Sequence, residues 1–285
     1  MSTNVPIYGP GSQPAEADGA NLDILQLPSG MDTYAAPILP EADEIHGIDD
    51  ALALLNQLQQ ALVNHASHPQ QPTLSLDELD PHNCNLVDQV LGEGEVSVMI
   101  NAGHTIQIQE SVLAGVWRIR TKDNKENLLA DEIEVGPIPQ RVIDFARQDA
   151  KLEVTMPETL ADGVINAPSL VSELDEQVKL HSNPEEKHPD HVINLTLLPQ
   201  SPDDLDLLQY QLGPGKVSIL SRGYGNCRIT STGTLNVWWV QYFNSQDANI
   251  LNSLEVSEIP NVACAAPEDI ADSAQRLQEI LEIYQ

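Results

Sequence analysis

The first 117 residues of the sequence contain no lysine and no arginine, and all 13 basic residues follow Trp117. Sixteen acidic residues lie in that stretch, and the whole chain has a formal net charge of −30. Such a charge opposes binding to a phosphate backbone, so we exclude nucleic acid as a partner. The lack of early basic residues also removes the positive region of a secretory signal and the Arg-rich face of a mitochondrial presequence.

Long apolar runs and clustered cysteines are also missing. No apolar run approaches the roughly 18 to 20 residues that span a bilayer, so we expect a cytoplasmic protein without membrane insertion. Cys84, Cys227 and Cys264 are odd in number and lack C-x-x-C spacing, which argues against a disulfide framework and a structural zinc site. Aromatics make up 4% of the residues, so Leu, Val, Ile and Ala must build the core.

The sequence contains an internal repeat with an offset of 121 residues. LGEGEVSV at 91–98 resembles LGPGKVSI at 212–219, and residues 74–139 share 16 identities in 66 positions with their equivalents. That is about a quarter, against roughly 6 to 7% by chance for average composition, and a tandem duplication explains it. The positions that mark the repeat are Gly92, Gly94 and Trp117 in the first copy and Gly213, Gly215 and Trp238 in the second.

Each copy predicts the same order of elements. A short apolar strand at 73–76 precedes a helix that begins at Pro81 and ends at Gly92, which we interpret as a helix cap. Four segments of period-two alternation follow and indicate an antiparallel meander. The matching segments of the second copy are a strand at 194–198 and a helix from Pro202 to Gly213. Further helices are predicted over 48–65, over 169–180 and from Pro267 onward.

We therefore predict an α+β fold, made by tandem duplication of an antiparallel four-stranded sheet module with flanking helices. An extended acidic N-terminal segment is expected at 1–45 and a linker at 153–168. The first α+β repeat then covers 46–152. The second covers 169–285 and includes the C-terminal helix.

Signatures of catalysis are missing from the sequence. The two G-x-G segments follow a helix and precede a strand, the opposite of the order in nucleotide-binding loops. Ser97 and Ser218 lack the G-x-S-x-G turn of a nucleophile. The paired acids sit at helix starts, where the helix dipole favours negative charge. We predict a protein that is not an enzyme and has no cofactor.

Two pairs of histidines have a spacing that metals sometimes use. They are His65-x-x-His68 and His188-x-x-His191, and both lie in polar stretches that contain proline. We interpret them as solvated surface pairs and predict no metal site. The alternative is that these histidines, with carboxylates, handle a metal or an iron–sulfur cluster, although three scattered cysteines argue against it.

Alternation along the third strand of each copy separates two faces. Trp117 and Trp238 point to the core, and the opposite face differs between the copies: Arg118, Arg120 and Lys122 correspond to Trp239, Gln241 and Phe243. One helical layer covers only one face of a sheet, so the second face must meet solvent, the sister repeat or a partner. We predict partner contacts at Arg118, Trp239 and Phe243. The alternative is that the two aromatics pack against the other repeat or the N-terminal segment.

The chain is similar to the HupH/HyaF family of hydrogenase expression/formation proteins, accessory factors of [NiFe] uptake hydrogenases. The resemblance runs nearly end to end. The blocks that carry it are GPGSQP at 9–14, GMDTY at 30–34, LGEGEVS at 91–97, GVWR at 115–118, INLT at 193–196 and AAPEDIADSAQRL at 265–277.

The resemblance implies a cytoplasmic, non-enzymatic factor that helps to mature the iron–sulfur small subunit of a membrane-bound hydrogenase before its export. Its implied partner is the small-subunit precursor, with other maturation factors as further candidates. Such precursors carry a twin-arginine leader, which an acidic protein can attract over long range. We predict that Met31 and Tyr34 contact this precursor. The alternative within the same pathway is delivery of a metal or an iron–sulfur cluster.

Overall fold

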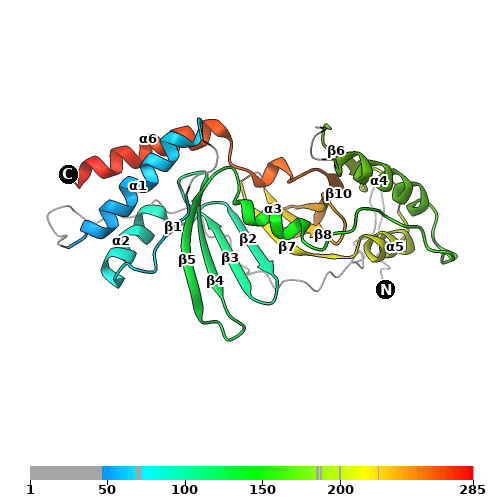
Figure 1. The fold of residues 1–285 in the computed structure, drawn as a ribbon. Coiled ribbons are helices and arrows are strands. Elements are labelled where there is room, and N and C mark those ends of the chain that lie inside the picture. Colours follow the sequence, from blue (N-terminus) through cyan, green and yellow to red (C-terminus); the bar gives the residue numbers. More distant parts are fainter. Residues whose placement is uncertain are drawn as a thin grey trace, which may run out of the picture.

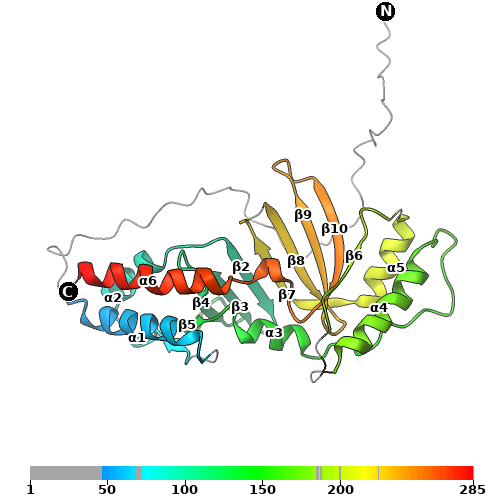
Figure 2. The ribbon, with the colours of Figure 1, turned by 90° about the horizontal axis from the view of Figure 1, so that it is seen from above.

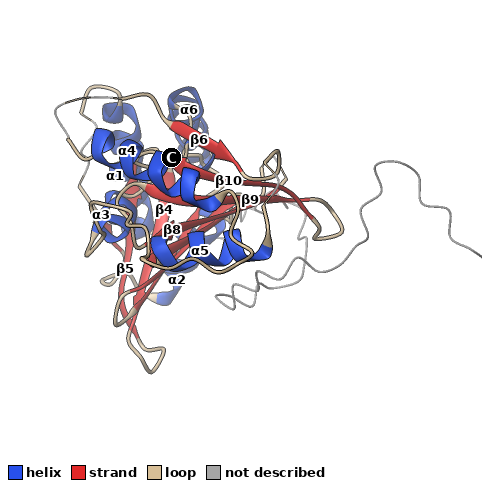
Figure 3. Cartoon of the chain, turned by 90° about the vertical axis from the view of Figure 1, so that its right-hand side faces the viewer, coloured by secondary structure: helices blue, strands red, loops and turns tan. Residues whose placement is uncertain are grey.

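The computed structural model describes residues 47–68, 72–183, 186, 188–198, 200–223 and 225–284 (Figure 1). It has an α+β fold, as the sequence predicts, with helices on either side of the strands (Figure 3). Its first half consists of α1 (Asp49–His65), β1 (Leu74–Ser75), α2 (Pro81–Leu91), β2 (Val96–Asn101), β3 (Thr105–Glu110), β4 (Val116–Lys122), β5 (Leu128–Val135) and α3 (Gln140–Arg147). Its second half consists of α4 (Ala167–His181), β6 (His191–Asn194), α5 (Pro202–Leu212), β7 (Pro214–Ser221), β8 (Asn226–Thr232), β9 (Val237–Phe243), β10 (Asn249–Val256), the 3-10 helix η2 (Asn261–Ala263) and α6 (Pro267–Ile283).

The strands form one antiparallel sheet with the order β1-β5-β4-β3-β2-β7-β8-β9-β10-β6. Two four-stranded meanders, β2 to β5 and β7 to β10, are present and are joined edge to edge in this single sheet. β2 pairs with β7, and Met99 lies opposite Ser218 at this junction. A free strand edge presents unpaired N–H and C=O groups, so joining the first strands of the meanders satisfies both edges at once.

A short strand extends each meander at its outer edge. Leu74 of β1 lies opposite Ile133, and Ile193 of β6 lies opposite Leu254. The predicted strand at 194–198 is therefore wrong, because β6 ends at Asn194. Leu74 and Ile193 hold equivalent places 119 residues apart, so the second half has two more residues between this strand and the next helix.

The helix that follows each short strand begins and ends as predicted. The Asp80 side chain accepts hydrogen bonds at the start of α2, and Ser201 forms a capping box with Asp204 at the start of α5. At the other end, Gly92 and Gly213 have φ angles of 53° and 68°. This left-handed backbone favours glycine. Gly213 leads directly into β7, whereas three residues separate Gly92 from β2.

A central core spans the junction of the two halves. Trp117 and Trp238 are buried in it, and helix α3, which the sequence did not predict, covers it with Val142 and Ile143. The Trp117 indole donates a hydrogen bond to the carbonyl of Gly136 at 2.8 Å. The equivalent bond, from Trp238 to the carbonyl of Ser257, measures 3.2 Å. Each tryptophan thus satisfies its N–H while its ring fills the core.

Two further cores lie on the other face of the sheet, one in each half. In the second half α4 and α5 cover the sheet, and the first half is covered by α1, α2 and α6. Helix α6 lies along α1 (Figure 2), and its Ile270, Leu277 and Leu281 are buried in the core of the first half. The predicted boundary placed this helix in the second repeat, whereas its packing ties it to the first.

The approach of α6 depends on Gly115, in the turn between β3 and β4. A Cβ atom there would lie 2.5 Å from Cγ1 of Ile270, and Gly115 has a φ angle of 78°. Asn236 takes the equivalent place in the second half, where its side chain contacts Arg147 and the carbonyl of His181. The second half thus has the Asn236 side chain at the position where Gly115 in the first half allows α6 to approach.

The predicted linker at 153–168 is packed at two points. Val154 is buried in the core of the second half, and its N–H donates to Asp175 of α4 at 3.0 Å. The amides of Ile165, Asn166 and Ala167 all donate to one carboxylate oxygen of Asp204. Among the described residues, no helix is both long and apolar enough to cross a membrane.

Candidate partner-binding surface

The sheet face opposite α3 is covered by helices at its two ends, while its central side chains remain exposed or half-exposed. Period-two alternation puts one set of side chains from the central strands on this side. We call this surface the open sheet face, and it consists of Ser97, Met99, Gln107, Gln109, Arg120, Lys122, Ser218, Leu220, Arg228, Thr230, Gln241 and Phe243.

The register places these side chains in rows that cross the junction. Ser218, Met99, Gln107 and Arg120 lie opposite one another in successive strands. The next row contains Ser97, Leu220, Arg228 and Gln241. Hydroxyl, amide, apolar and positively charged groups lie side by side on this surface, and the carboxylates of Asp88 and Asp131 pair with Arg120 at its margin. Such a surface can hydrogen-bond a polypeptide and also bury part of it.

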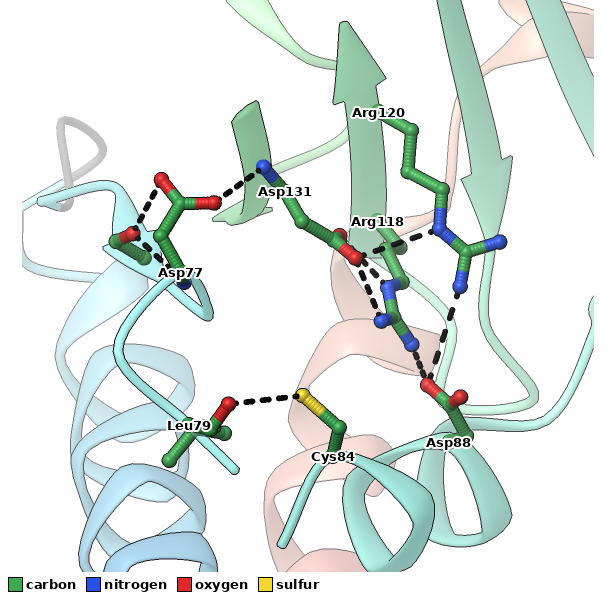
Figure 4. A network of polar contacts seen from close by, with 8 residues as sticks. Asp77, Leu79, Cys84, Asp88, Arg118, Arg120 and Asp131 are labelled. Atoms are coloured by element: carbon green, nitrogen blue, oxygen red, sulfur yellow. Dashed lines mark hydrogen bonds and ion pairs between the residues drawn. The ribbon is translucent and has the colours of Figure 1, made fainter. Parts of the chain in front are cut away.

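Arg118 points to this side of the sheet but is engaged within the chain (Figure 4). Its Nε and Nη2 atoms contact the two oxygens of Asp131 at 2.8 and 2.7 Å, and it also pairs with Asp88 of α2. Its side chain is only 12% exposed. The predicted partner contact at Arg118 is therefore corrected, because a bidentate ion pair binds this side chain to α2 and β5.

Arg120 lies beside this network at the margin of the open sheet face (Figure 4). Its Nε is 3.4 Å from Asp131, and its side chain is 45% exposed. The backbone of Asp131 is held in turn, because its N–H donates to the Asp77 carboxylate at 3.0 Å. Arg120 is therefore held at its Nε atom by Asp131, while part of its guanidinium group remains exposed to solvent.

Trp239 is buried, with 6% of its surface exposed, so the prediction that it contacts a partner is wrong. Its ring lies in the core beneath α4 and α5, together with Leu170 and Leu208. Its indole nitrogen donates to the Asn252 side chain at 2.5 Å. The prediction assumed that helices cover only one face of the sheet. In the structure, α4 and α5 also cover the face to which Trp239 points.

Phe243 is half-exposed at the end of β9, on the open sheet face. The guanidinium carbon of Arg228 lies 5.3 Å from the centre of its ring, a cation–π contact. Of the predicted partner contacts, Phe243 thus keeps an accessible ring. Met31 and Tyr34 lie outside the described residues.

Sequence reasoning missed Arg228 as a member of this surface. The signal was present, because Cys227 and Ile229 alternate with it along β8 and both are buried. Period-two alternation therefore placed Arg228 on the opposite side, in register with Gln241. A single basic residue within an otherwise uncharged strand of an acidic protein is the feature to look for.

The histidines of the metal hypothesis fall at opposite ends of the molecule. His65 ends α1, whereas His191 begins β6 and contacts Glu173 at 2.7 Å (Figure 1). His188 lies near His181, with ring centres 5.7 Å apart and the ring planes tilted by 56°. Within the described part of the chain, no three His, Cys, Asp or Glu side chains are arranged to hold a metal ion.

Comparison with known proteins identifies the family. The family model described as "HupH hydrogenase expression protein, C-terminal conserved region" matches the chain twice, over residues 48–155 and 164–284. The chain is 45% identical to hydrogenase expression/formation protein HoxQ of Cupriavidus necator, over 98% of this chain and 96% of that protein.

Other relatives agree with this match. Hydrogenase expression/formation protein HupH of Rhodobacter capsulatus is 43% identical over 96% of this chain and 95% of its own length. Hydrogenase-1 operon protein HyaF of Escherichia coli is 34% identical over 97% and 95%. A structure of hydrogenase expression protein HupH from Thiobacillus denitrificans aligns with a TM-score of 0.37 and 30% identity, over 41% of this chain and 95% of that one. The chain belongs to the HupH/HyaF family of hydrogenase expression/formation proteins.

Proposed function

We propose that this protein is a non-enzymatic accessory protein for the maturation of a [NiFe] uptake hydrogenase. Its relatives are named as hydrogenase expression/formation proteins, which supports a role in that process. In this proposal it acts in the cytoplasm as a chaperone. It binds the iron–sulfur small-subunit precursor before export.

The open sheet face is the observation that carries this proposal. It offers hydroxyl and amide groups for hydrogen bonds, together with apolar groups from Met99, Leu220 and Phe243. Methionine adapts its shape to different surfaces, and aromatic and arginine side chains dominate the energetics of binding. The pair of Arg228 and Phe243 is therefore the centre of the proposed contact.

The charge of the chain supports a second contact with the precursor. Residues 1–45 contain seven acidic residues and no lysine or arginine. An acidic segment attracts a basic export leader and raises the rate of encounter. We propose that Met31 and Tyr34 contact the leader there, while the open sheet face binds the mature part of the small subunit.

We also infer that the two halves arose by tandem duplication, with repeats at 46–152 and 169–285. Both halves have the same order of elements, from α1 to β5 and from α4 to β10. The family model matches each half separately, which is expected of a duplicated unit. In this view the C-terminal helix belongs to the second repeat by sequence and completes the core of the first.

The test is the affinity of purified small-subunit precursor for wild-type protein and for a double variant, Arg228→Ala with Phe243→Ala. We expect the double variant to bind at least about tenfold more weakly, because hot-spot truncations cost about 2 kcal/mol or more. Tyr210→Ala is the matched control, since Tyr210 is 79% exposed on α5 and lies outside the open sheet face. Unchanged affinity in a double variant with native circular dichroism would overturn the proposal.

A further inference from the structure

Glu255 of β10 is a half-buried carboxylate without a basic partner. Its side chain lies on the same side of the sheet as Trp238, which is opposite it in β9. Among the described residues, no hydrogen bond or ion pair holds this carboxylate. Burial raises the pKa of Glu255, and the nearby carboxylate of Asp190 raises it further. Desolvation and like charge both disfavour the ionised form, and a cation bound beside it would offset them.

The first half shows which group the equivalent position binds. Glu134 is equivalent to Glu255 in the repeat, and each lies opposite the core tryptophan of its half. The Glu134 carboxylate accepts from Nε of Arg141 at 2.8 Å, and Nη1 of Arg141 donates to Glu132 at 2.9 Å. One guanidinium group thus satisfies two carboxylates on this side of the sheet.

The second half has two carboxylates here but lacks the arginine. Val262 takes the place of Arg141 in the repeat, and its side chain packs against the central core. Asp190 supplies the second carboxylate, which accepts from Nδ2 of Asn261 at 3.2 Å. The place that Arg141 fills in the first half is therefore without a basic side chain from the described part of the second half.

This acidic site adjoins a free edge of the sheet. Strand β6 lies beyond β10 as the last strand of the sheet, and its Val192 is opposite Glu255 (Figure 2). Leu195, just after β6, donates its N–H to the carbonyl oxygen of Asn252 at 2.8 Å. Backbone groups alternate in direction along an antiparallel strand, so those of Val192 and Asn194 point away from β10. They offer N–H and C=O groups to an added strand.

An added strand would direct one of its side chains toward the two carboxylates. Val192 is 54% exposed, and the residue paired with it in the new strand would point to the same side of the sheet. Two strand spacings, about 10 Å, separate that residue from β10. A long basic side chain can cross Val192 with its apolar stem and bring its charge to Glu255. Arginine fits better than lysine because its planar group can contact two carboxylates at once.

We propose that Glu255 and Asp190 bind an arginine side chain of another polypeptide, whose extended segment pairs with the outer edge of β6. The site lies on the opposite side of the sheet from the open sheet face and does not depend on the proposed function. A second copy of the chain does not fit, because residues 191–194 contain no lysine or arginine and the copy would bring further carboxylates to an acidic site.

A labelled heptapeptide of alternating threonine and valine, with arginine at its centre, serves as the probe. Its binding to the full chain is measured by fluorescence anisotropy. We expect replacement of the arginine by citrulline, which has a similar shape without the charge, to weaken binding at least about tenfold. Glu255→Gln should weaken it by a similar factor. Glu282→Gln is the matched control and should leave binding unchanged, since Glu282 is exposed on α6.

Two backbone changes test the added strand. Val192→Pro removes an N–H that points away from β10, so the variant should keep its native circular dichroism and lose the peptide. N-methylation of the peptide along one edge should abolish binding, whereas methylation along the other edge should not, because only one edge faces β6. Equal binding of the two methylated peptides would overturn the pairing.

Other outcomes would overturn the arginine site. They are absence of binding by the arginine peptide, and equal binding of the arginine and citrulline peptides. Loss of binding in the Arg228→Ala, Phe243→Ala double variant, with none in Glu255→Gln, would assign the peptide to the open sheet face and leave the proposed function intact. Sedimentation showing a dimer that Val192→Pro converts to a monomer would assign the edge of β6 to a second copy.

Discussion

The Trp239 indole donates a hydrogen bond to the Asn252 side chain at 2.5 Å, in the place where Arg118 and Asp131 form an ion pair in the other half of the protein. Arg118 and Trp239 are equivalent in the repeat, and so are Asp131 and Asn252. The donor and the acceptor have changed together, and each pair connects the third and fourth strands of its meander. A polar contact between the third and fourth strands is therefore present in both halves. It is an ion pair in the first half and a neutral hydrogen bond in the second.

We expect Asn252→Ala to destabilise the protein by about 1–3 kcal/mol, because it leaves a largely buried indole N–H without its acceptor. Urea unfolding followed by tryptophan fluorescence measures this loss. Asn249→Ala is the matched control, since Asn249 is exposed on the same strand. Its change should stay within about 0.5 kcal/mol. Equal losses in the two variants would contradict the role of the Trp239 bond.

Glu110 should make stability depend on pH. Burial raises the pKa of Glu110 to about 7, the Gly115 amide lowers it in part, and Glu95 raises it further. The folded state therefore binds a proton more tightly than the unfolded state between about pH 4.5 and 7, and stability falls as pH rises through that window. Glu110→Gln has no carboxyl group to ionise at this position, so it should not lose this stability as pH rises. We expect the variant to match wild type near pH 4.5 and to exceed it at pH 8 by on the order of 3 kcal/mol.

Chemical unfolding at several pH values tests this expectation. Glu93→Gln provides the control, because Glu93 is exposed in the segment between α2 and β2. A stability difference between Glu110→Gln and wild type that stays constant with pH would show that the effect is packing and not ionisation.

Gly115→Ala should weaken the docking of α6 on the first half. The new methyl group would lie 2.5 Å from Ile270 and would also force a positive φ angle on alanine. Gly103→Ala separates the two effects, because Gly103 has a φ angle of 80° with no atom within 4 Å of an added Cβ. Both variants should lose about 1–2 kcal/mol from backbone strain. We expect a further loss, and faster amide exchange in α6, only for Gly115→Ala.

Asp204→Ala should destabilise the second half by about 2 kcal/mol or more, because the carboxylate accepts from the Ser201 amide in the capping box of α5 and also from the amides that begin α4. Burial would raise the pKa of Asp204, yet the amides of Ala167, Ser201, Ile165 and Asn166 outweigh it and lower the pKa to about 2. The stability it contributes is therefore present above about pH 4 and is lost as pH falls toward 2.

The repeat itself supplies the control for Asp204. Asn83 takes the equivalent place in the first half, where its side-chain oxygen accepts from Ala51 in α1. Asp204→Asn should therefore keep most of the stability that Asp204→Ala loses. It should also reduce the dependence on pH between 4 and 2, as measured by acid unfolding. Equal losses in the two variants would contradict the capping role.

Local patterns predicted much of this fold. The helix starts at Pro81 and Pro202, the glycines that end those helices, and the alternation that buries Trp117 and Trp238 all involve residues within one turn or one strand. Helix α3 was missed because eight residues show too few periods for a clear signal. At the candidate surface, alternation predicts the side to which each residue points, and the packing then leaves Phe243 accessible and engages Trp239 and Arg118 inside the chain.

Local sequence patterns were sufficient to predict the repeated unit, the order of elements in each half and the face to which each strand residue points. Those features follow from backbone periodicity and capping, which act over a few residues. Only the tertiary structure decided that β2 joins β7, that α6 returns to the first half, and which parts of the second face are covered. Alternation predicts the side of the sheet to which a side chain points. The helix that covers that side is set by contacts between segments that can lie more than a hundred residues apart.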